Sequence, residues 1–111
     1  MTDLIEKHCK ACEGGVAPLS RTEAEQLLKK VDSWELNADA TEIQRTLAFK
    51  NYYHTMAFVN ALAYISHAEN HHPDLMVSYN RCVVRYSTHA IGGLSENDFI
   101  CAAKTDALLK K

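Results

Sequence analysis

The chain has 111 residues, a mass of 12.5 kDa and a formal net charge of -2. This length fits one domain, and 47% hydrophobic with 23% charged residues is an ordinary globular composition, which excludes a disordered, collagen-like or disulfide-scaffold chain. With 12 basic and 14 acidic side chains, the chain has no overall positive charge to attract nucleic acid or an anionic membrane. The unusual count is six histidines, five of them between positions 54 and 89.

Export and metal signals are missing from the sequence. No run of eighteen apolar residues predicts a membrane-spanning helix, and Met1–Lys10 has no apolar stretch typical of a secretory signal, so we expect a cytoplasmic protein. The cysteines are then expected to be thiols. Cys9 and Cys12 form a CxxC, but no second pair completes a zinc set. Cys82 and Cys101 fall at apolar positions and are predicted to be small core residues.

The N-terminal half predicts a helix, two strands and a longer helix. Residues 1–19 are expected to be irregular, because Gly14-Gly15 and Pro18 interrupt any helix. Ser20 and Glu23 form a capping box, which predicts a helix ending near Asp32-Ser33. Alternating residues over 34–38 and 43–49, with a turn at 39–40, predict two strands. Helical spacing over 51–70 then predicts the longest element, whose apolar stripe is interpreted as core packing: Tyr52, Met56, Val59, Ala63 and Ser66, broadened by Phe58, Leu62 and Ile65.

The C-terminal half predicts a second hairpin and a last helix. Pro73 ends the long helix, and strands are expected over 75–79 and 82–86 with a turn at Tyr79-Asn80. Gly92-Gly93 predicts a loop, and Ser95–Asp98 begins the last helix. The order α-β-β-α-β-β-α predicts one α+β domain over residues 1–111, a two-layer sandwich with a four-stranded antiparallel sheet and three helices on one face.

Four histidines are predicted to gather at one end of this sandwich. His67 and His71 are four residues apart and share a helix face, and His72 follows directly. If the second hairpin turns at Tyr79-Asn80, the numbers of opposed residues add to about 159, which returns His89 to the neighbourhood of His71. His8 and His54 lie outside this group and are interpreted as ordinary residues.

Three interpretations of the group remain open from the residues alone. The histidines could be exposed or locally hydrogen-bonded residues with no chemical role. Three imidazoles, from His67, His71 and His89, could hold zinc, although no carboxylate or cysteine is clearly in reach. Alternatively, imidazoles that titrate near neutral pH could move protons on a small substrate without a metal.

The spacing of these residues resembles one known family, the pterin-4a-carbinolamine dehydratases. The resemblance rests on His67, His71-His72-Pro73, Tyr79, His89 and Asp98, and is extended by Ser87-Thr88 and by residues 93–98. Trp34 and Phe49-Lys50 also fall where that family has similar residues. The CxxC, Gly14-Gly15 and Pro18-Leu19 resemble bacterial members, so the likeness covers nearly the whole chain.

The resemblance implies an α+β two-layer sandwich and an enzyme that removes water from 4a-hydroxytetrahydropterin to give quinonoid dihydropterin. Such a reaction recycles the cofactor of aromatic amino-acid hydroxylases, phenylalanine hydroxylase above all. The pterin is the substrate, and no metal or other cofactor is implied.

The resemblance also assigns roles to residues. His71 and His89 are implied to be the acid/base pair, and His72 to join them by binding and positioning the substrate. His67, Pro73, Ser87, Thr88 and Asp98 are implied to support substrate binding, Asp98 also being a helix cap. Position 67 departs from the family, because many animal members have Glu where this chain has His67.

A second reading treats the fold as an interaction module. Relatives in the family act as dimerisation partners of a homeodomain transcription factor, and bacterial members are linked to regulation of hydroxylase expression. We expect no direct nucleic-acid binding, given the net charge of -2. Exposed sheet edges favour pairing between subunits, so a homodimer through an edge strand, or a tetramer through the long helices, is expected.

Overall fold

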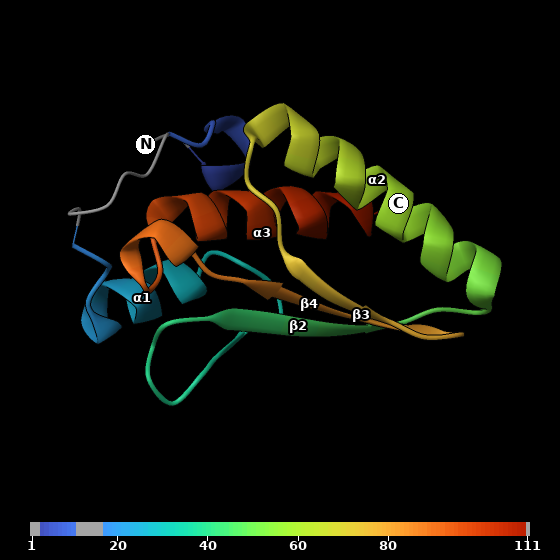
Figure 1. Ribbon diagram of the computed structural model, residues 1–111, viewed down its shortest axis with the longest axis horizontal. Helices are drawn as coiled ribbons and strands as arrows, with labels where there is room; N and C mark the ends of the chain where they lie inside the picture. The colour runs from blue at the N-terminus through green and yellow to red at the C-terminus, as the bar shows by residue number, and fades with distance from the viewer. Residues whose placement is uncertain (1–2, 11–16, 111) are drawn as a thin grey trace.

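The computed structural model describes residues 3–10 and 17–110 of the chain and confirms the predicted α+β fold (Figure 1). The elements follow in this order: a 3-10 turn η1 (Leu4–Glu6), α1 (Arg21–Leu28), β1 (Glu35–Leu36), β2 (Ile43–Ala48), α2 (Tyr52–Glu69), β3 (Asp74–Val77), β4 (Arg81–Tyr86), a 3-10 turn η2 (His89–Ile91) and α3 (Glu96–Leu108). Within those described ranges, no helix is both long and apolar enough to cross a membrane.

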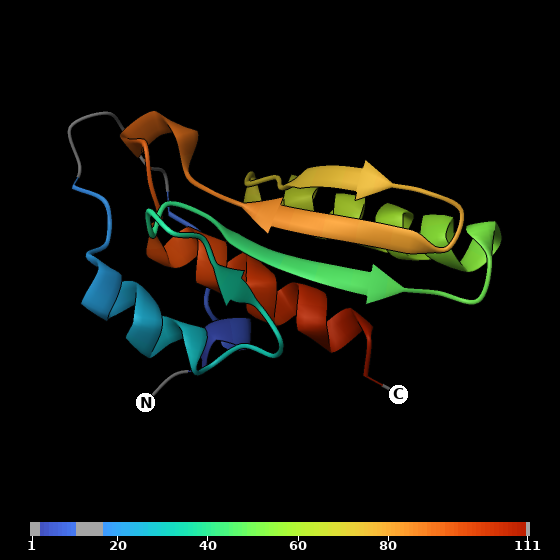
Figure 2. The ribbon, with the colours of Figure 1, turned by 90° about the horizontal axis from the view of Figure 1, so that it is seen from below.

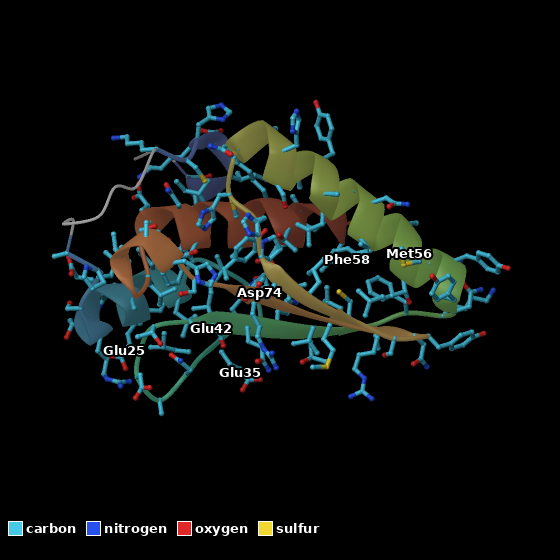
Figure 3. The ribbon with its side chains drawn as sticks, viewed as in Figure 1. Glu25, Glu35, Glu42, Met56, Phe58 and Asp74 are labelled. Atoms are coloured by element: carbon cyan, nitrogen blue, oxygen red, sulfur yellow. The ribbon has the colours of Figure 1, made fainter. Side chains whose placement is uncertain are left out.

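The four strands form one antiparallel sheet in the order β1-β2-β4-β3. Helices α2 and α3 lie together on one side of this sheet, while α1 packs at its end against β1 and α3 (Figures 1 and 2). The core fills the space between the two layers. Its members are buried apolar side chains from the central strands and from α2 and α3, such as Ile43, Leu47, Val84, Tyr86, Phe58, Leu62, Phe99 and Ile100. Phe58 is one of these, on the side of α2 that faces the sheet (Figure 3).

An ion pair explains why the alternation of β2 is broken at Arg45. This residue has the same parity as the buried Ile43 and Leu47, so its side chain enters the apolar layer. Its guanidinium donates to Asp106 Oδ1 of α3 at 2.6 Å. Trp34 Nε1 donates to the same oxygen at 2.8 Å, which satisfies this buried carboxylate.

Helix α1 begins as predicted but ends earlier. The capping box of Ser20 and Glu23 is present, and the helix stops at Leu28 rather than near Asp32-Ser33. The chain then tightens into i to i-3 hydrogen bonds at residues 30 and 31, and Ser33 takes a positive φ of 63°. The backbone therefore leaves the helical path before the apolar pattern ends.

The apolar stripe predicted for α2 needs correction. Thr55, Phe58 and Leu62 form the fully buried line, whereas Tyr52 and Ala63 are exposed. Thr55 can be buried because its hydroxyl donates to the carbonyl groups of Asn51 and Tyr79, at 3.0 Å each. The true contact line is therefore rotated from the stripe chosen by hydrophobicity.

The second hairpin has the predicted register but an unexpected environment. Asp74 pairs with Arg85 and Val77 with Cys82, so opposed numbers add to 159 as predicted. The strand β3 ends at Val77, and Tyr79 lies in the turn. All four residues of β3 are exposed, because this strand is at the sheet edge.

The N-terminal residues are not wholly irregular as expected. We call residues 3–10 the N-terminal strap. It contains η1, buries Leu4 and packs along α3, with Lys104 Nζ donating to the carbonyl of Ile5 at 2.8 Å. Cys12 and Gly14-Gly15, which carried part of the sequence argument, lie outside the described residues.

Candidate active site

A cleft of about 640 Å³ lies where the end of α2, the end of β4 and the start of α3 meet. Its lining includes His71 and His72 from the exit of α2, Ser87, Thr88 and His89 after β4, and His8 to Lys10 of the strap. This volume is within the range of about 300–1,000 Å³ that is usual for small-molecule sites. The cleft is therefore large enough for a small organic substrate.

The end of α2 fixes where His71 stands. Asn70 takes the left-handed conformation with φ 52°, which ends the helix. The backbone N–H of His71 donates back to the carbonyl of Ser66 at 3.2 Å, so the chain turns sharply across the helix terminus. The turn directs residues 71 and 72 toward the sheet end rather than onward along the helix axis.

A buried carboxylate holds the His71 ring. His71 Nε2 lies 2.7 Å from Asp98 Oδ1, and the Asp98 side chain has no exposed area. The other oxygen, Oδ2, accepts from Thr88 Oγ1 at 2.8 Å and from the backbone N–H of Ser95 at 3.0 Å. The ring also stacks on Tyr86, with centroids 5.9 Å apart and planes 9° apart. Hydrogen bonds and ring packing therefore determine its orientation together.

This arrangement assigns the His71 tautomer. An ionised carboxylate can only accept hydrogen bonds, so Nε2 carries the proton that it donates to Asp98. The Nδ1 lone pair of neutral His71 is then free of that bond and can accept a proton. Asp98 would stabilise the imidazolium that results, as buried carboxylates do for catalytic histidines.

His89 lies in a contrasting environment. It is the first residue of η2, and its Nε2 lies 4.0 Å from Asp74 Oδ2, with 72% and 66% of the two side chains exposed. Figure 3 shows Asp74 at the start of β3. Gly92 ends η2 with a positive φ of 66°, and an isolated bridge joins Thr88 to Gly93. The backbone of this loop is defined, while the His89 ring is open to solvent.

The loop that carries His89 packs against Pro18 through Gly93. The N–H of Leu19 donates to the carbonyl of Leu94 at 2.8 Å, so residues 17–19 run along this loop. A Cβ atom at position 93 would lie 2.7 Å from Cβ of Pro18. Only glycine allows this approach without a shift of the backbone.

The structure brings most of the predicted site residues together, but only some of them line the cleft. His71, His72, Ser87, Thr88 and His89 line the cleft, whereas His67 is exposed on the last turn of α2 and Pro73 is half-buried, both outside the lining. Asp98 lies behind His71, which fits support of that ring. The hydroxyls of Ser87 and Thr88 donate to the carbonyl of Thr41 and to Asp98, so both also serve internal contacts.

Sequence reasoning missed a wall of the cleft formed by the strap. Glu69 Oε1 accepts from the N–H of Cys9 at 2.7 Å, and Oε2 lies 2.9 Å from His8 Nδ1. Asn97 exchanges two hydrogen bonds with the backbone of Lys10, at 3.0 and 2.6 Å. These contacts join residues 60 to 87 positions apart. A weak signal was present, since His8 was part of the histidine count.

Electrostatics distinguish the carboxylate under the strap. Burial alone would raise the pKa of Glu69, but hydrogen bonds from Cys9 N–H and His8, with the nearby Lys104 ammonium, bring this pKa below its ordinary value. Glu69 is thus ionised at neutral pH, and its charge is directed at the strap and Lys104.

Cys82 and Cys101 are core residues, as predicted, and both are fully buried. Burial raises the pKa of Cys82, and the Cys9 sulfur at 3.5 Å, followed by burial, raises the pKa of Cys101. Raised pKa values keep thiols protonated and unreactive. In the described part of the chain, no three His, Cys, Asp or Glu side chains are grouped to hold a metal ion.

Comparison with known proteins identifies the family of this chain. The family model described as pterin 4 alpha carbinolamine dehydratase matches residues 17–108. The chain belongs to this family. Relatives named as provisional pterin-4-alpha-carbinolamine dehydratases include one from Nitrosomonas eutropha, 66% identical over 108 residues (96% of this chain, 94% of the relative). One from Legionella pneumophila is 53% identical over 109 residues (97% and 96%).

Two solved structures share the dehydratase fold. A transcriptional coactivator/pterin dehydratase from Brucella melitensis superposes with a TM-score of 0.80 at 28% identity, covering 84% of this chain and 99% of that one. A pterin dehydratase-like protein identified as a RuBisCO assembly factor in the alpha-carboxysome gives a TM-score of 0.60 at 26% identity, covering 68% and 88%. The names of these two structures describe more than one role.

Proposed function

We propose that this protein removes water from 4a-hydroxytetrahydropterin and releases quinonoid dihydropterin. One observation carries the proposal: a cleft of small-molecule size, in a chain of this family, contains His71 oriented by a buried carboxylate and shares its lining with His72 and His89. Imidazoles are suited to proton transfer at neutral pH.

The reaction needs one proton delivered and one removed. The bond from C4a to the hydroxyl oxygen breaks, the hydroxyl leaves as water after it receives a proton, and a ring nitrogen of the pterin loses a proton. His71 and His89 supply these two transfers, and His72 binds the pterin between them. The fixed ring of His71, whose Nδ1 takes no part in the bond to Asp98, favours this residue as the proton acceptor. The His89 ring, exposed and weakly paired, is suited to exchange protons with solvent.

The product defines the wider role that we propose. Quinonoid dihydropterin is the form from which a reductase regenerates the tetrahydropterin used by aromatic amino-acid hydroxylases. The protein would then act beside phenylalanine hydroxylase, needing no metal and no further cofactor.

The test is a dehydration assay on 4a-hydroxytetrahydropterin generated by a hydroxylase. The purified protein should accelerate loss of this compound, and EDTA should leave the acceleration unchanged. Replacing both His71 and His89 by Ala should lower the rate by at least the roughly 10²- to 10⁴-fold attributed to one positioned acid or base. Wild-type activity in the double variant would reject these roles, and loss with EDTA followed by recovery with zinc would favour a metal site.

A second candidate role is assembly with other chains. The observation in its favour is the edge strand β3, where Leu75, Met76 and Val77 are exposed to 38%, 58% and 39%. Exposed Tyr53 and Tyr64 lie on α2, the helix predicted for a tetramer contact. Two of the structural relatives bear names that describe coactivation or assembly.

We expect a homodimer through β3, and its test is a charge on the edge. Met76→Lys should disfavour pairing of two such edges, because charged side chains on an edge strand oppose strand addition. Sedimentation velocity should show a dimer in the wild type and a shift to monomer in M76K. Thr46→Lys, at an exposed position of the central strand β2, serves as a surface control. A wild-type monomer, or an M76K dimer of unchanged stability, would contradict pairing through β3.

A further inference from the structure

The N-terminal strap completes the cleft from outside the part of the chain that defines the family. The family model begins at residue 17, yet His8, Cys9 and Lys10 line the same cleft as His71 and His89. The strap thus adds to the site a wall that the rest of the fold does not provide.

Buried polar side chains hold this wall in place. The Glu69 side chain is 5% exposed and Asn97 is 6% exposed, and their hydrogen bonds reach the backbone of Cys9 and Lys10. Asn97 accepts from the backbone N–H of Lys10 and donates to the carbonyl of Lys10, so both peptide groups of Lys10 are held. Charged and buried hydrogen bonds of this kind are among the stronger contacts in proteins. A segment held this way has a defined position.

The residues that hold the strap are neighbours of the residues that hold His71. Glu69 is two positions before His71, at the end of α2, and Asn97 directly precedes Asp98 in α3. The same two helix termini therefore position both the imidazole and the strap. The wall and the reacting imidazole are therefore held by the same part of the fold.

The strap presents two polar side chains to the cleft. The Lys10 ammonium belongs to none of the ion pairs found within residues 3–10 and 17–110, and Lys10 is exposed at the lining. The His8 ring is 81% exposed and tethered through Nδ1 to Glu69. A ligand hydroxyl suits both side chains, because it accepts from an ammonium and can either donate to or accept from an imidazole nitrogen.

We propose that the strap is a substrate-binding wall, that Glu69 and Asn97 are its positioning residues, and that Lys10 and His8 contact an oxygen-bearing side chain of the pterin. The inference rests on the proposed dehydratase function and deepens it by naming the substrate class. It assigns the strap to binding and leaves proton transfer with the histidines already described.

The experiment compares two carbinolamines, one with a 1,2-dihydroxypropyl group at C6 and one with a methyl group there. The double variant H8A/K10A should raise KM for the dihydroxypropyl substrate about tenfold, the equivalent of one or two lost hydrogen bonds. Its kcat should stay the same, and KM for the methyl substrate should change less than about twofold. The matched control K29A/H54A removes an exposed lysine and histidine far from the cleft and should leave both KM values unchanged.

The positioning residues are tested by variants and rescue. N97A and E69A should each raise KM for the dihydroxypropyl substrate, and adding H8A/K10A should cause little further change, because the wall is already displaced. E69Q keeps an oxygen that can accept from Cys9 N–H and should recover part of the loss. Thermal melts identify any variant that has not folded, and the surface variant H8A/K10A decides the question in that event.

Several outcomes overturn the proposal. Equal KM changes for both substrates, or none for either, would reject the strap as a contact for the side chain. Binding of the corresponding 7,8-dihydropterins, followed by fluorescence quenching, gives a second readout that needs no turnover. If wild-type protein turns over neither carbinolamine but H8A/K10A weakens only the dihydroxypropyl ligand, then the dehydratase proposal fails and the binding wall stands. Unchanged binding of both ligands rejects the wall.

Discussion

Two histidines that line the same cleft pair with carboxylates in very different surroundings. His71 and Asp98 are 2.7 Å apart, with 12% and 0% of their side chains exposed, and further hydrogen bonds fix the carboxylate. His89 and Asp74 are 4.0 Å apart, with 72% and 66% exposed. The buried Asp98 carboxylate orients the His71 ring. Water screens the attraction between His89 and Asp74, so this pair holds the His89 ring only weakly.

The pair of His8 and Glu69 is intermediate between these two. The ring is exposed, but its carboxylate is buried and receives other hydrogen bonds. The exposed fraction of the carboxylate side chain increases from Asp98 to Glu69 to Asp74, at 0%, 5% and 66%. Their contributions to activity and stability should follow the same order, with the largest at His71 and Asp98 and the smallest at His89 and Asp74.

The largest effect is expected from Asp98→Asn. An amide presents an N–H₂ group where Thr88, Ser95 or His71 donates, so one donor is left without a partner and the ring loses its fixed tautomer. We expect kcat to fall about 10- to 100-fold and the free energy of unfolding to fall by about 1 to 3 kcal/mol. Steady-state dehydration and urea denaturation measure the two quantities.

Asp106→Asn is the matched control for that variant. Asp106 is a buried carboxylate of the same helix, but it pairs with Arg45 and Trp34 outside the cleft. It should lose stability and keep its kcat. If D98N and D106N changed kcat alike, Asp98 would be no more than a structural residue.

A middle effect is expected at Glu69 and depends on pH. Its pKa is lowered in the folded protein, so its ionised form stabilises the fold at pH above the unfolded-state pKa, and this contribution is lost as pH falls through the folded-state pKa. E69Q should therefore be less stable than wild type at neutral pH, by about 1 to 2 kcal/mol. The difference should shrink in acid. Urea denaturation of both proteins over a pH range of about 2 to 7 measures this difference. A difference that stays constant with pH would contradict an ionised Glu69.

The smallest effect is expected from Asp74→Asn. The exposed pair with His89 is worth about 0 to 1 kcal/mol, so stability should change by less than about 0.5 kcal/mol and kcat/KM by less than about twofold. His89→Ala, in contrast, should lower kcat with little loss of stability. A large loss of activity in D74N would show that His89 is oriented as firmly as His71 and would end the contrast between the two pairs.

Local patterns predicted much of the fold. The capping boxes at Ser20 and Ser95 mark the starts of α1 and α3, and Asn80 with Pro73 set the second hairpin in the observed register. That register, together with the end of α2, brings His71, His72 and His89 to one cleft. Predictions failed where neighbours in sequence do not decide the environment. Tyr52 and Ala63 are apolar residues that the rotation of α2 leaves exposed, and β3 is an edge strand whose four residues are exposed.

The sequence by itself determined the order of elements, the hairpin register and the grouping of three histidines, because caps, turns and periodicity act over a few residues. Only the tertiary structure decided that Asp98 lies behind His71, that Asp106 receives Arg45 inside the core, and that the strap closes the cleft through Glu69 and Asn97. Those contacts join residues 27 to 87 positions apart. Their formation depends on the packing of whole helices against the sheet, which no local pattern specifies.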